Sequence, residues 1–319
     1  MAFRTALTER LGLRHPILLA PMGAVAGGAL AAAVTRAGGL GLIGPGYLDE
    51  TWIGEQFDAA GNTRVGIGFI TWDLAKHPKR LDAALDRKPA CVMLSFGDAA
   101  PFVPKIRSAG AALILQVQSV DEAKAAARLG ADVIIAQGSE AGGHGVTGRA
   151  LSSLLPSVID AVAPVPVAAA GGIADGRGLA AALAQGAAGV LVGTRFYAAA
   201  ESLGHANAKA LLVASGGGDT VRTHIFDIVR GIDWPKHYTG RAIRNAFTSR
   251  WHGQERALSE SLESEKARYT AASAAGDVST AVVWAGEGLD MIDAVLPAAE
   301  IVERMVAEAE TALARIKRA

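Results

Sequence analysis

Residues 165–178 read VPVAAAGGIADGRG, a short apolar run followed by a glycine-rich turn. The run at 165–170 has the length and the continuous apolar character of a strand that is buried on both faces of a parallel sheet. The glycines after it permit a tight turn, and the Ala-rich stretch at 175–185 predicts a helix. This segment therefore indicates one β–α unit of a parallel α/β fold.

The same unit recurs through the first 200 residues. Apolar runs bounded by Gly or Pro predict eight strands, at 16–20, 39–43, 65–70, 91–96, 112–117, 132–137, 165–170 and 189–192. Helices are expected between them, at 24–37, 119–129, 151–162, 175–185 and 198–213. Eight β–α units in this length favour an α/β protein of the (β/α)8 TIM-barrel type, and the alternative is an open doubly wound sheet.

The pattern changes after residue 215. Three consecutive glycines at 216–218 form a flexible break, and residues 223–251 are expected to be irregular. Amphipathic helices are predicted at 255–274 and 298–317. We therefore expect a barrel at 1–215 and an irregular and helical C-terminal extension at 216–319 that packs on the barrel.

Composition excludes several classes of protein. Half of the 319 residues are apolar, which excludes a disordered chain, and 31 basic against 31 acidic residues argue against a nucleic-acid binder. The single cysteine, Cys91, excludes an intramolecular disulfide and a multi-cysteine metal site, so no metal is expected. Pro21 and several glycines interrupt the apolar run at 17–34, which therefore does not predict a membrane span. We expect a cytoplasmic protein without membrane or nucleic-acid partners, and whether it forms a homo-oligomer is left open.

The loops after the seventh and eighth strands predict a phosphate site. Gly171 and Gly172 follow one strand, and Gly193 and Thr194 follow the other. Glycines there let backbone N–H groups approach an anion, and barrels often bind phosphate between these two loops. The alternative is that both loops are only tight turns.

The loop after the sixth strand carries the candidate base. Residues 137–145 read QGSEAGGHG, so His144 lies among glycines at the mouth of the barrel. Histidine accepts a proton near neutral pH, although a loop histidine is often only solvated. Glu140 is a second candidate base or an acceptor that braces the loop.

Further residues at strand ends suit a flat ligand. Met22, after the first strand, has a thioether that can pack on an aromatic ring or belong to the core. One of the pair Gln116 and Gln118 can face the barrel axis and bind a ligand. Residues 95–97, after the fourth strand, are expected to form an ordinary tight end.

Together these stretches resemble the nitronate monooxygenase family, formerly called 2-nitropropane dioxygenases. The resemblance extends from residue 16 to about residue 251, and its segments are 16–22, 37–43, 95–98, 136–145, 169–178 and 193–196. It implies a barrel that binds FMN without a covalent bond. The implied cofactor contacts are Gly171, Gly172, Gly193 and Thr194 at the phosphate, Pro21, Met22 and Gly23 along the isoalloxazine ring, and Gln116, Gln137 and Gly142 at the ring or the ribityl chain. His144 matches the catalytic base of the family.

The resemblance also implies an activity. The expected enzyme is a monooxygenase that uses O2 to oxidise small alkyl nitronates, or nitroalkanes, to carbonyl compounds and nitrite. The alternatives are an NAD(P)H-dependent flavin reductase, of the NADH:quinone reductase or enoyl-acyl-carrier-protein reductase type, and a non-catalytic protein that binds flavin or phosphate. Many family members end strand three in an Asn that contacts flavin, whereas this chain has Gly68 within residues 66–70. In the tail, Arg241 is expected to offer a cation near the site or to brace a loop.

Overall fold

Eight parallel strands form the centre of the molecule. The computed structural model describes residues 3–316, and its central strands are β1 (Ile17–Leu19), β2 (Leu42–Ile43), β3 (Gly66–Ile70), β4 (Cys91–Ser95), β5 (Ala112–Val117), β6 (Val133–Gln137), β8 (Val167–Ala170) and β9 (Gly189–Val192). They are ordered β1-β9-β8-β6-β5-β4-β3-β2. A parallel bridge from Leu18 to Leu40, just before β2, joins the two edges. The sheet therefore closes into the predicted barrel.

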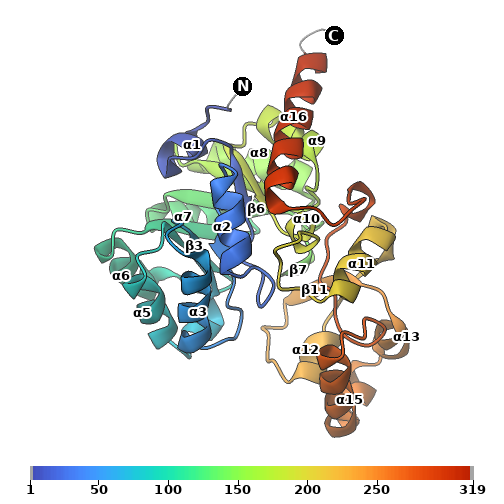
Figure 1. The fold of residues 1–319 in the computed structure, drawn as a ribbon. Helices are drawn as coiled ribbons and strands as arrows, with labels where there is room; N and C mark the ends of the chain where they lie inside the picture. Colours follow the sequence, from blue (N-terminus) through green and yellow to red (C-terminus); the bar gives the residue numbers. More distant parts are fainter. Residues whose placement is uncertain (1–2, 317–319) are drawn as a thin grey trace.

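Helices surround the barrel on its outer face (Figure 1). They are α2 (Gly28–Arg36), α3 (Glu50–Ala60), α5 (Lys79–Asp86), α6 (Val103–Ser108), α7 (Val120–Arg128), α8 (Leu151–Val162) and α9 (Gly176–Ala184), with the short α4 (Thr71–Leu74) and a 3-10 turn at Ala100–Phe102 between strands and helices. Each long helix turns a buried apolar face to the sheet, and these faces form the main hydrophobic core.

A second apolar cluster fills the barrel itself. It contains Leu18, Leu42, Met93 and Ile114, which the alternation of side chains along each strand directs inward. Leu7 of α1 (Ala6–Leu11) belongs to the same cluster and is fully buried. Helix α1 therefore covers the amino-terminal end of the barrel, and the carboxyl-terminal end is left for a ligand.

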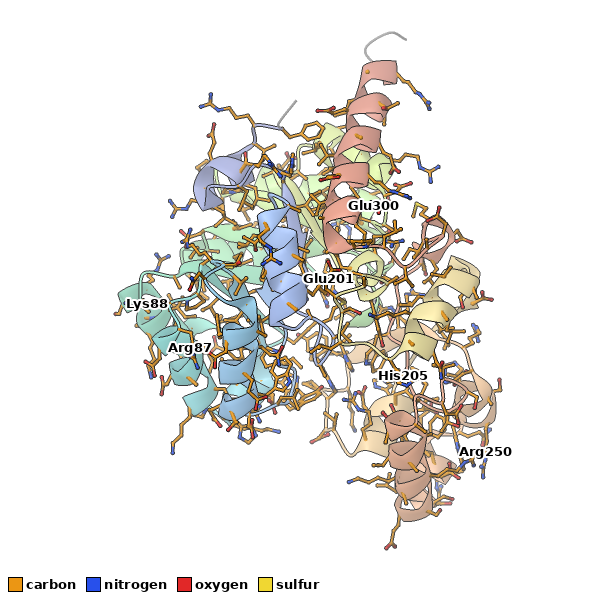
Figure 2. All side chains as sticks on the ribbon, in the orientation of Figure 1. Arg87, Lys88, Glu201, His205, Arg250 and Glu300 are labelled. Atoms are coloured by element: carbon orange, nitrogen blue, oxygen red, sulfur yellow. The ribbon has the colours of Figure 1, made fainter. Side chains whose placement is uncertain are left out.

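The eighth helix position is filled by the end of the chain. Helix α16 (Ala298–Ile316) packs against α9 and α2 (Figure 1), and Gly176 donates a backbone hydrogen bond to the Glu308 carboxylate at 2.8 Å. Glu201, labelled in Figure 2, accepts a hydrogen bond of 2.9 Å from the backbone N–H of Ala298. The residues between the short helix α10 (Thr194–Tyr197) and α16 thus form an insertion within the eighth β–α unit.

The single helix expected at 198–213 is wrong. The chain turns after α10, and a later helix, α11, covers Ala206–Ala214. Gly204 packs against the ring of Tyr197, where an added Cβ would lie 2.9 Å from Cδ2 of that ring. His205 then begins α11, because its Nδ1 accepts a hydrogen bond of 3.1 Å from the backbone of Asn207.

The irregular segment expected at 223–251 is also wrong. It contains α12 (Ile225–Arg230), β11 (Tyr238–Ile243) and α13 (Ala246–Trp251). Strand β11 pairs antiparallel with β10 (Thr220–Thr223) and with β7 (Gly143–Val146), and we call this three-stranded unit the small sheet. The helix expected at 255–274 is divided at Ser261 into α14 (Glu255–Glu260) and α15 (Leu262–Ala274), and 3-10 turns lie at Gly217–Asp219 and Leu289–Met291.

Candidate active site

A cavity of about 340 Å³ opens at the carboxyl-terminal ends of the barrel strands. Its wall contains His144 and the residues that the sequence singles out for the cofactor, whereas Glu140, the second candidate base, is not part of it. The cofactor candidates on the wall are Pro21, Met22, Gly23, Gln116, Gln137, Gly142, Gly171, Gly172, Gly193 and Thr194. The structure therefore brings them together, while their individual roles stay predictions.

The two glycine loops form a cradle of backbone N–H groups. Gly171 and Gly172 have φ values of 120° and 67°, which only glycine adopts readily. Within residues 3–316, the N–H groups of Gly171, Gly172, Gly193 and Thr194 make no turn, loop or cap hydrogen bond. An anion such as a phosphate fits this cradle, because it would satisfy those donors.

The close approach of Pro21 explains why position 68 is a glycine. A Cβ added at Gly68 would lie 2.6 Å from Cβ of Pro21 and would overlap the rest of the proline ring. Both residues line the cavity. The structure therefore has no room at this position for the Asn that many family members carry.

Three glutamines connect the sixth strand to the loop after it. Gln137 accepts hydrogen bonds from the amides of Gln116, at 2.9 Å, and of Gln118. Its own amide nitrogen lies 3.2 Å from the carbonyl oxygen of His144, and Gln118 accepts from the backbone of Val146 at 2.9 Å. Gln116 lines the cavity, and Gln118 stabilises the wall behind it.

His144 is held by a carboxylate from the insertion. It lies on β7, opposite Gly240 of β11, and its Nε2 is 2.9 and 3.0 Å from the two carboxylate oxygens of Asp227. An ionised carboxylate only accepts hydrogen bonds, so Nε2 carries the proton and donates it. The lone pair of a neutral His144 is consequently on Nδ1, which is the atom that can take a proton.

Burial sets the protonation state of His144. The side chains of His144 and Asp227 are 9 % and 4 % exposed. Burial lowers the pKa of His144 below its usual value of 6.5, and the hydrogen bond and charge of Asp227 partly oppose this shift. Arg230 and Arg222 lower the same pKa further. The imidazole is therefore neutral, and able to act as a base, at physiological pH.

Aromatic rings enclose the imidazole. Trp234 is stacked on His144 with ring centroids 3.7 Å apart, and the ring of Trp284 lies 5.0 Å away. Trp234 also donates its indole N–H to the hydroxyl of Tyr47 at 2.6 Å. Phe96 contacts Trp234 edge-on and has a φ of 65°, a conformation that is costly for a non-glycine residue. Residues 95–97 are therefore not the ordinary tight end that we expect from the sequence, because Phe96 lines the cavity.

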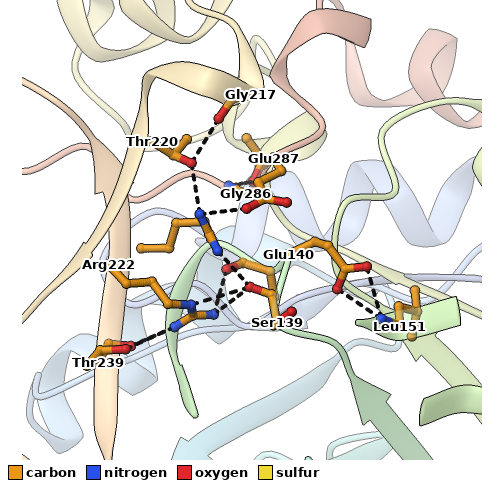
Figure 3. A network of polar contacts seen from close by, with 12 residues as sticks. Ser139, Glu140, Leu151, Gly217, Thr220, Arg222, Thr239, Gly286 and Glu287 are labelled. Carbon is orange, nitrogen blue, oxygen red and sulfur yellow. Dashed lines mark hydrogen bonds and ion pairs between the residues drawn. The ribbon is translucent and has the colours of Figure 1, made fainter. Parts of the chain in front are cut away.

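Two arginines fix the loop that carries His144. Arg222 donates to the carbonyl oxygen of Ser139 at 2.9 Å (Figure 3). Arg241 donates to the same oxygen at 3.0 Å. Arg241 is also paired with Glu287 at 2.7 Å, and burial lowers the pKa of Arg222 to about 10. Of the two expectations for Arg241, bracing a loop is the one that its contacts favour.

Glu140 is occupied by a helix terminus. Its two carboxylate oxygens accept from the backbone N–H of Leu151, the first residue of α8, at 2.9 and 3.0 Å (Figure 3). A carboxylate at this place also suits the positive end of the helix dipole. Glu140 thus fits its bracing interpretation rather than that of a second base.

The sequence analysis does not predict the site residues that come from the insertion. Asp227, Arg230, Trp234 and Trp284 all come from segments beyond residue 215, and Tyr47 follows β2. Asp227 lies 83 positions after His144, and no local spacing marks the two as partners. The Trp and Arg content of 223–251 was the available signal, since such residues are frequent in binding sites.

Within the described residues, no group of three or more His, Cys, Asp or Glu side chains is placed to hold a metal ion, and no helix is long and apolar enough to cross a membrane.

Comparisons with known proteins point to one family. The family model described as nitronate monooxygenase matches residues 55–308. A nitronate monooxygenase of Neurospora crassa is 32 % identical over 351 aligned positions, which cover 95 % of this chain and 92 % of that protein. A (3aS,4S,5R,7aS)-5-hydroxy-7a-methyl-1-oxo-octahydro-1H-indene-4-carboxyl-CoA dehydrogenase of Rhodococcus jostii is 41 % identical over 224 positions. These positions cover 68 % of this chain and 62 % of that protein, so the match spans less than two thirds of the relative's length.

Solved structures agree over nearly the whole chain. FabK from Thermotoga maritima superposes with a TM-score of 0.88 at 29 % identity and covers 99 % of both chains. A nitroalkane oxidase from Streptomyces ansochromogenes superposes with a TM-score of 0.81 at 30 % identity, covering 98 % of this chain and 100 % of that one.

Proposed function

The chain belongs to the nitronate monooxygenase family, and we propose that it is an FMN-dependent enzyme that uses O2 to oxidise alkyl nitronates, or their parent nitroalkanes, to carbonyl compounds and nitrite. The family is the one that the sequence segments indicate, and the enzyme is an oxidoreductase. The observation that carries the proposal is the pair His144 and Asp227 at a cavity that His144 lines, together with a cradle of backbone N–H groups in the same cavity that make no turn, loop or cap hydrogen bond.

The residues present fit FMN. The N–H groups of Gly171, Gly172, Gly193 and Thr194 would hold the phosphate, and Pro21, Met22 and Gly23 would lie along the isoalloxazine ring. Gln116, Gln137 and Gly142 would contact the ring or the ribityl chain. When bound, FMN would supply the redox chemistry, since no side chain of a protein carries electrons between an organic substrate and O2 in this way.

His144 would act as the base on neutral nitroalkanes. The α-proton of a nitroalkane is acidic because the resulting charge spreads onto the nitro oxygens. Nδ1 of His144 would take this proton, and Asp227 would hold the ring and stabilise the imidazolium that results. A nitronate that is already ionised would enter without this step. The aromatic side chains around His144 would exclude water from the reacting carbon.

A second candidate function follows from the Rhodococcus relative. Its identity of 41 % exceeds the 32 % of the Neurospora nitronate monooxygenase, although over a shorter stretch. Under this hypothesis the substrate is a hydroxylated carboxyl-CoA thioester that the enzyme dehydrogenates, and His144 takes the proton that the substrate loses. The NAD(P)H-dependent flavin reductase is the other alternative, and the same experiment separates all three.

The test is anaerobic mixing of the purified protein with one donor at a time. Ethylnitronate, NADH, NADPH and a hydroxyacyl-CoA are each added, and loss of flavin absorbance is followed by stopped flow. We expect ethylnitronate to reduce the flavin faster than NADH does. Rapid reduction by NADH or NADPH, and none by the nitronate, would move the assignment to a flavin reductase. Reduction by the thioester alone would move it to a dehydrogenase.

A further inference from the structure

The cavity contains a single permanently charged side chain. Among the described residues that line it, only Arg230 is a lysine or arginine, and none is an aspartate or glutamate. Its guanidinium has no ion pair and no hydrogen bond to any residue in 3–316, and it lies over Tyr47, whose ring centroid is 5.6 Å from Cζ. Arg222 and Arg241, by contrast, already donate to carbonyl, hydroxyl or carboxylate oxygens of the protein. Arg230 therefore has donors to offer to something that enters the cavity.

Helix α12 places this cation next to the base. Asp227 and Arg230 are three residues apart, so they share one face of the helix. Asp227 binds Nε2 of His144, and the positive charge of Arg230 is close enough to lower the pKa of the same imidazole. The face that orients His144 thus also presents an unpaired guanidinium to the cavity.

An anion of two oxygens suits this arrangement. A guanidinium donates two parallel hydrogen bonds to a carboxylate-like group, and such charge-assisted bonds are about twice as strong as neutral ones. The glycine cradle at Gly171, Gly172, Gly193 and Thr194 offers backbone N–H groups, whereas Arg230 offers a charged side chain that lies over Tyr47 and acts on His144 by its charge. The cavity therefore has two distinct places for negative charge.

We propose that Arg230 binds the two oxygens of the nitro or nitronate group of the substrate and stabilises the negative charge that develops there. This rests on the proposed function. When His144 removes the α-proton, the C–H bond breaks and the proton goes to Nδ1. The electron pair of that bond forms a C=N bond, and the negative charge moves onto the nitro oxygens. Arg230 balances this new charge, as Asp227 balances that of the imidazolium, so the net charge of the site is unchanged.

The first experiment measures binding without turnover. Propionate has a two-oxygen anion like that of a nitronate, and propionamide is its neutral counterpart. Isothermal calorimetry compares both probes on the purified protein and on Arg230→Met, Arg230→Gln and Arg230→Lys, with Arg244→Met as the matched control because Arg244 is exposed and outside the cavity. We expect propionate to bind roughly ten- to a hundredfold more weakly to Arg230→Met and Arg230→Gln, the loss typical of a charge-assisted hydrogen bond. Arg230→Lys should lose less, and propionamide should bind all variants alike.

The second experiment measures the reaction. For Arg230→Gln, KM for ethylnitronate should rise with little change in kcat, since the anion is present before the reaction. On neutral nitroethane, kcat should fall, since the anion forms only during the reaction. FMN affinity should match that of the unmodified protein.

The outcomes separate the two claims. Equal propionate binding by the unmodified protein and by both neutral variants would overturn the proposal. So would a loss of FMN affinity in the Arg230 variants, because Arg230 would then serve the cofactor. If propionate binding is lost in the variants but no protein oxidises nitronates, the anion site stands and the proposed function fails. Arg230→Gln and Arg230→Lys keep the test decisive if Arg230→Met does not fold.

Discussion

The indole of Trp234 lies flat on the imidazole of His144, with the ring planes 5° apart and the centroids 3.7 Å apart. His144 comes from a barrel loop, whereas Trp234 comes from the insertion, in the segment after α12. The stack fixes the plane of the imidazole, and the hydrogen bond from Nε2 to Asp227 fixes the rotation of the ring within that plane. Only Nδ1 is then left to meet a substrate.

This stack predicts different effects for two substitutions of Trp234. Trp234→Phe keeps a flat ring on His144 but loses the hydrogen bond to Tyr47 and part of the buried volume of the indole, so stability should fall by about 1–3 kcal/mol with activity largely retained. Trp234→Leu removes the ring and should lower kcat as well as stability, because the imidazole is no longer held in one plane. Thermal unfolding and steady-state kinetics of the two variants check this. Equal activity of the Leu variant and the unmodified protein would contradict it.

Replacing the base should affect neutral and ionised substrates differently. His144→Asn should keep FMN bound, because other residues of the cavity wall form the phosphate cradle. Activity on neutral nitroalkanes should fall by roughly 10²–10⁴, the loss typical of a general base, and activity on nitronates much less. Initial rates with nitroethane and with freshly ionised ethylnitronate measure the two. Equal losses on both substrates, with weakened flavin binding, would instead indicate a structural histidine.

Asp227 should control the pH profile of the base. Only the neutral imidazole accepts a proton, so the rate on a neutral nitroalkane rises with pH through the pKa of His144 and is flat above it. Asp227 raises this pKa, while burial, Arg230 and Arg222 lower it. Asp227→Asn should therefore move the rising limb to lower pH. The plateau should fall roughly ten- to a hundredfold, because the imidazolium loses a charge-assisted hydrogen bond of about 1.5–3 kcal/mol.

The control for this shift is Asp233→Asn, which removes an exposed carboxylate a few residues away. Its profile should coincide with that of the unmodified protein. A rising limb that moves to higher pH in Asp227→Asn would show that the carboxylate does not act through the charge of His144.

The glycine cradle predicts a charge-specific loss of cofactor. Gly172→Asp should abolish FMN binding, because it places a carboxylate where the phosphate would bind. Gly12→Asp is the matched control, since Gly12 has a φ of 68° against 67° for Gly172, and no atom lies within 4 Å of its added Cβ. Both variants place an aspartate at a similar positive φ, and only the first should lose flavin. Flavin content after purification and after addition of FMN gives the answer.

Gly68 should not tolerate the Asn of other family members. A side chain there collides with Pro21, so Gly68→Asn should destabilise the protein by about 1–3 kcal/mol and weaken FMN binding by displacing Pro21. Gly218→Asn, at an exposed glycine with no atom within 4 Å of the added Cβ, should leave both unchanged. Denaturant unfolding and FMN titration measure the two effects. A fully stable Gly68→Asn protein with tight FMN would contradict the role of Pro21.

The barrel was predictable because its information is local. Each strand is a buried apolar run next to a glycine turn, as at 165–178, and the closed sheet follows from repeating that unit. The residues at strand ends reach one cavity for the same reason, since parallel strands end at one face. The sequence did not assign α16 to the eighth helix position of the barrel. About a hundred residues separate β9 from α16, and no local pattern shows which later helix packs beside α9 and α2.

The acid–base partner was not predictable for a related reason. Asp227 lies on α12, between β10 and β11, and it reaches His144 because β11 pairs with β7. Such long-range antiparallel pairing leaves little trace in the hydrophobic pattern of either strand. Phe96 was misjudged because a positive φ in a non-glycine residue is imposed by packing, here against Trp234 and Tyr238, rather than by its own preference.

The small sheet has a consequence for the order in which the chain is synthesised. All eight barrel strands have left the ribosome once residue 192 emerges, yet β10, β11 and Asp227 emerge later and α16 emerges last. Because a chain is made from its amino terminus, β7 is synthesised before β11, the strand that pairs with it at His144. A nascent chain therefore has all its barrel strands before Asp227, Trp234 and Trp284 are present to contact His144, so the surroundings of that imidazole are completed only after the barrel strands are made.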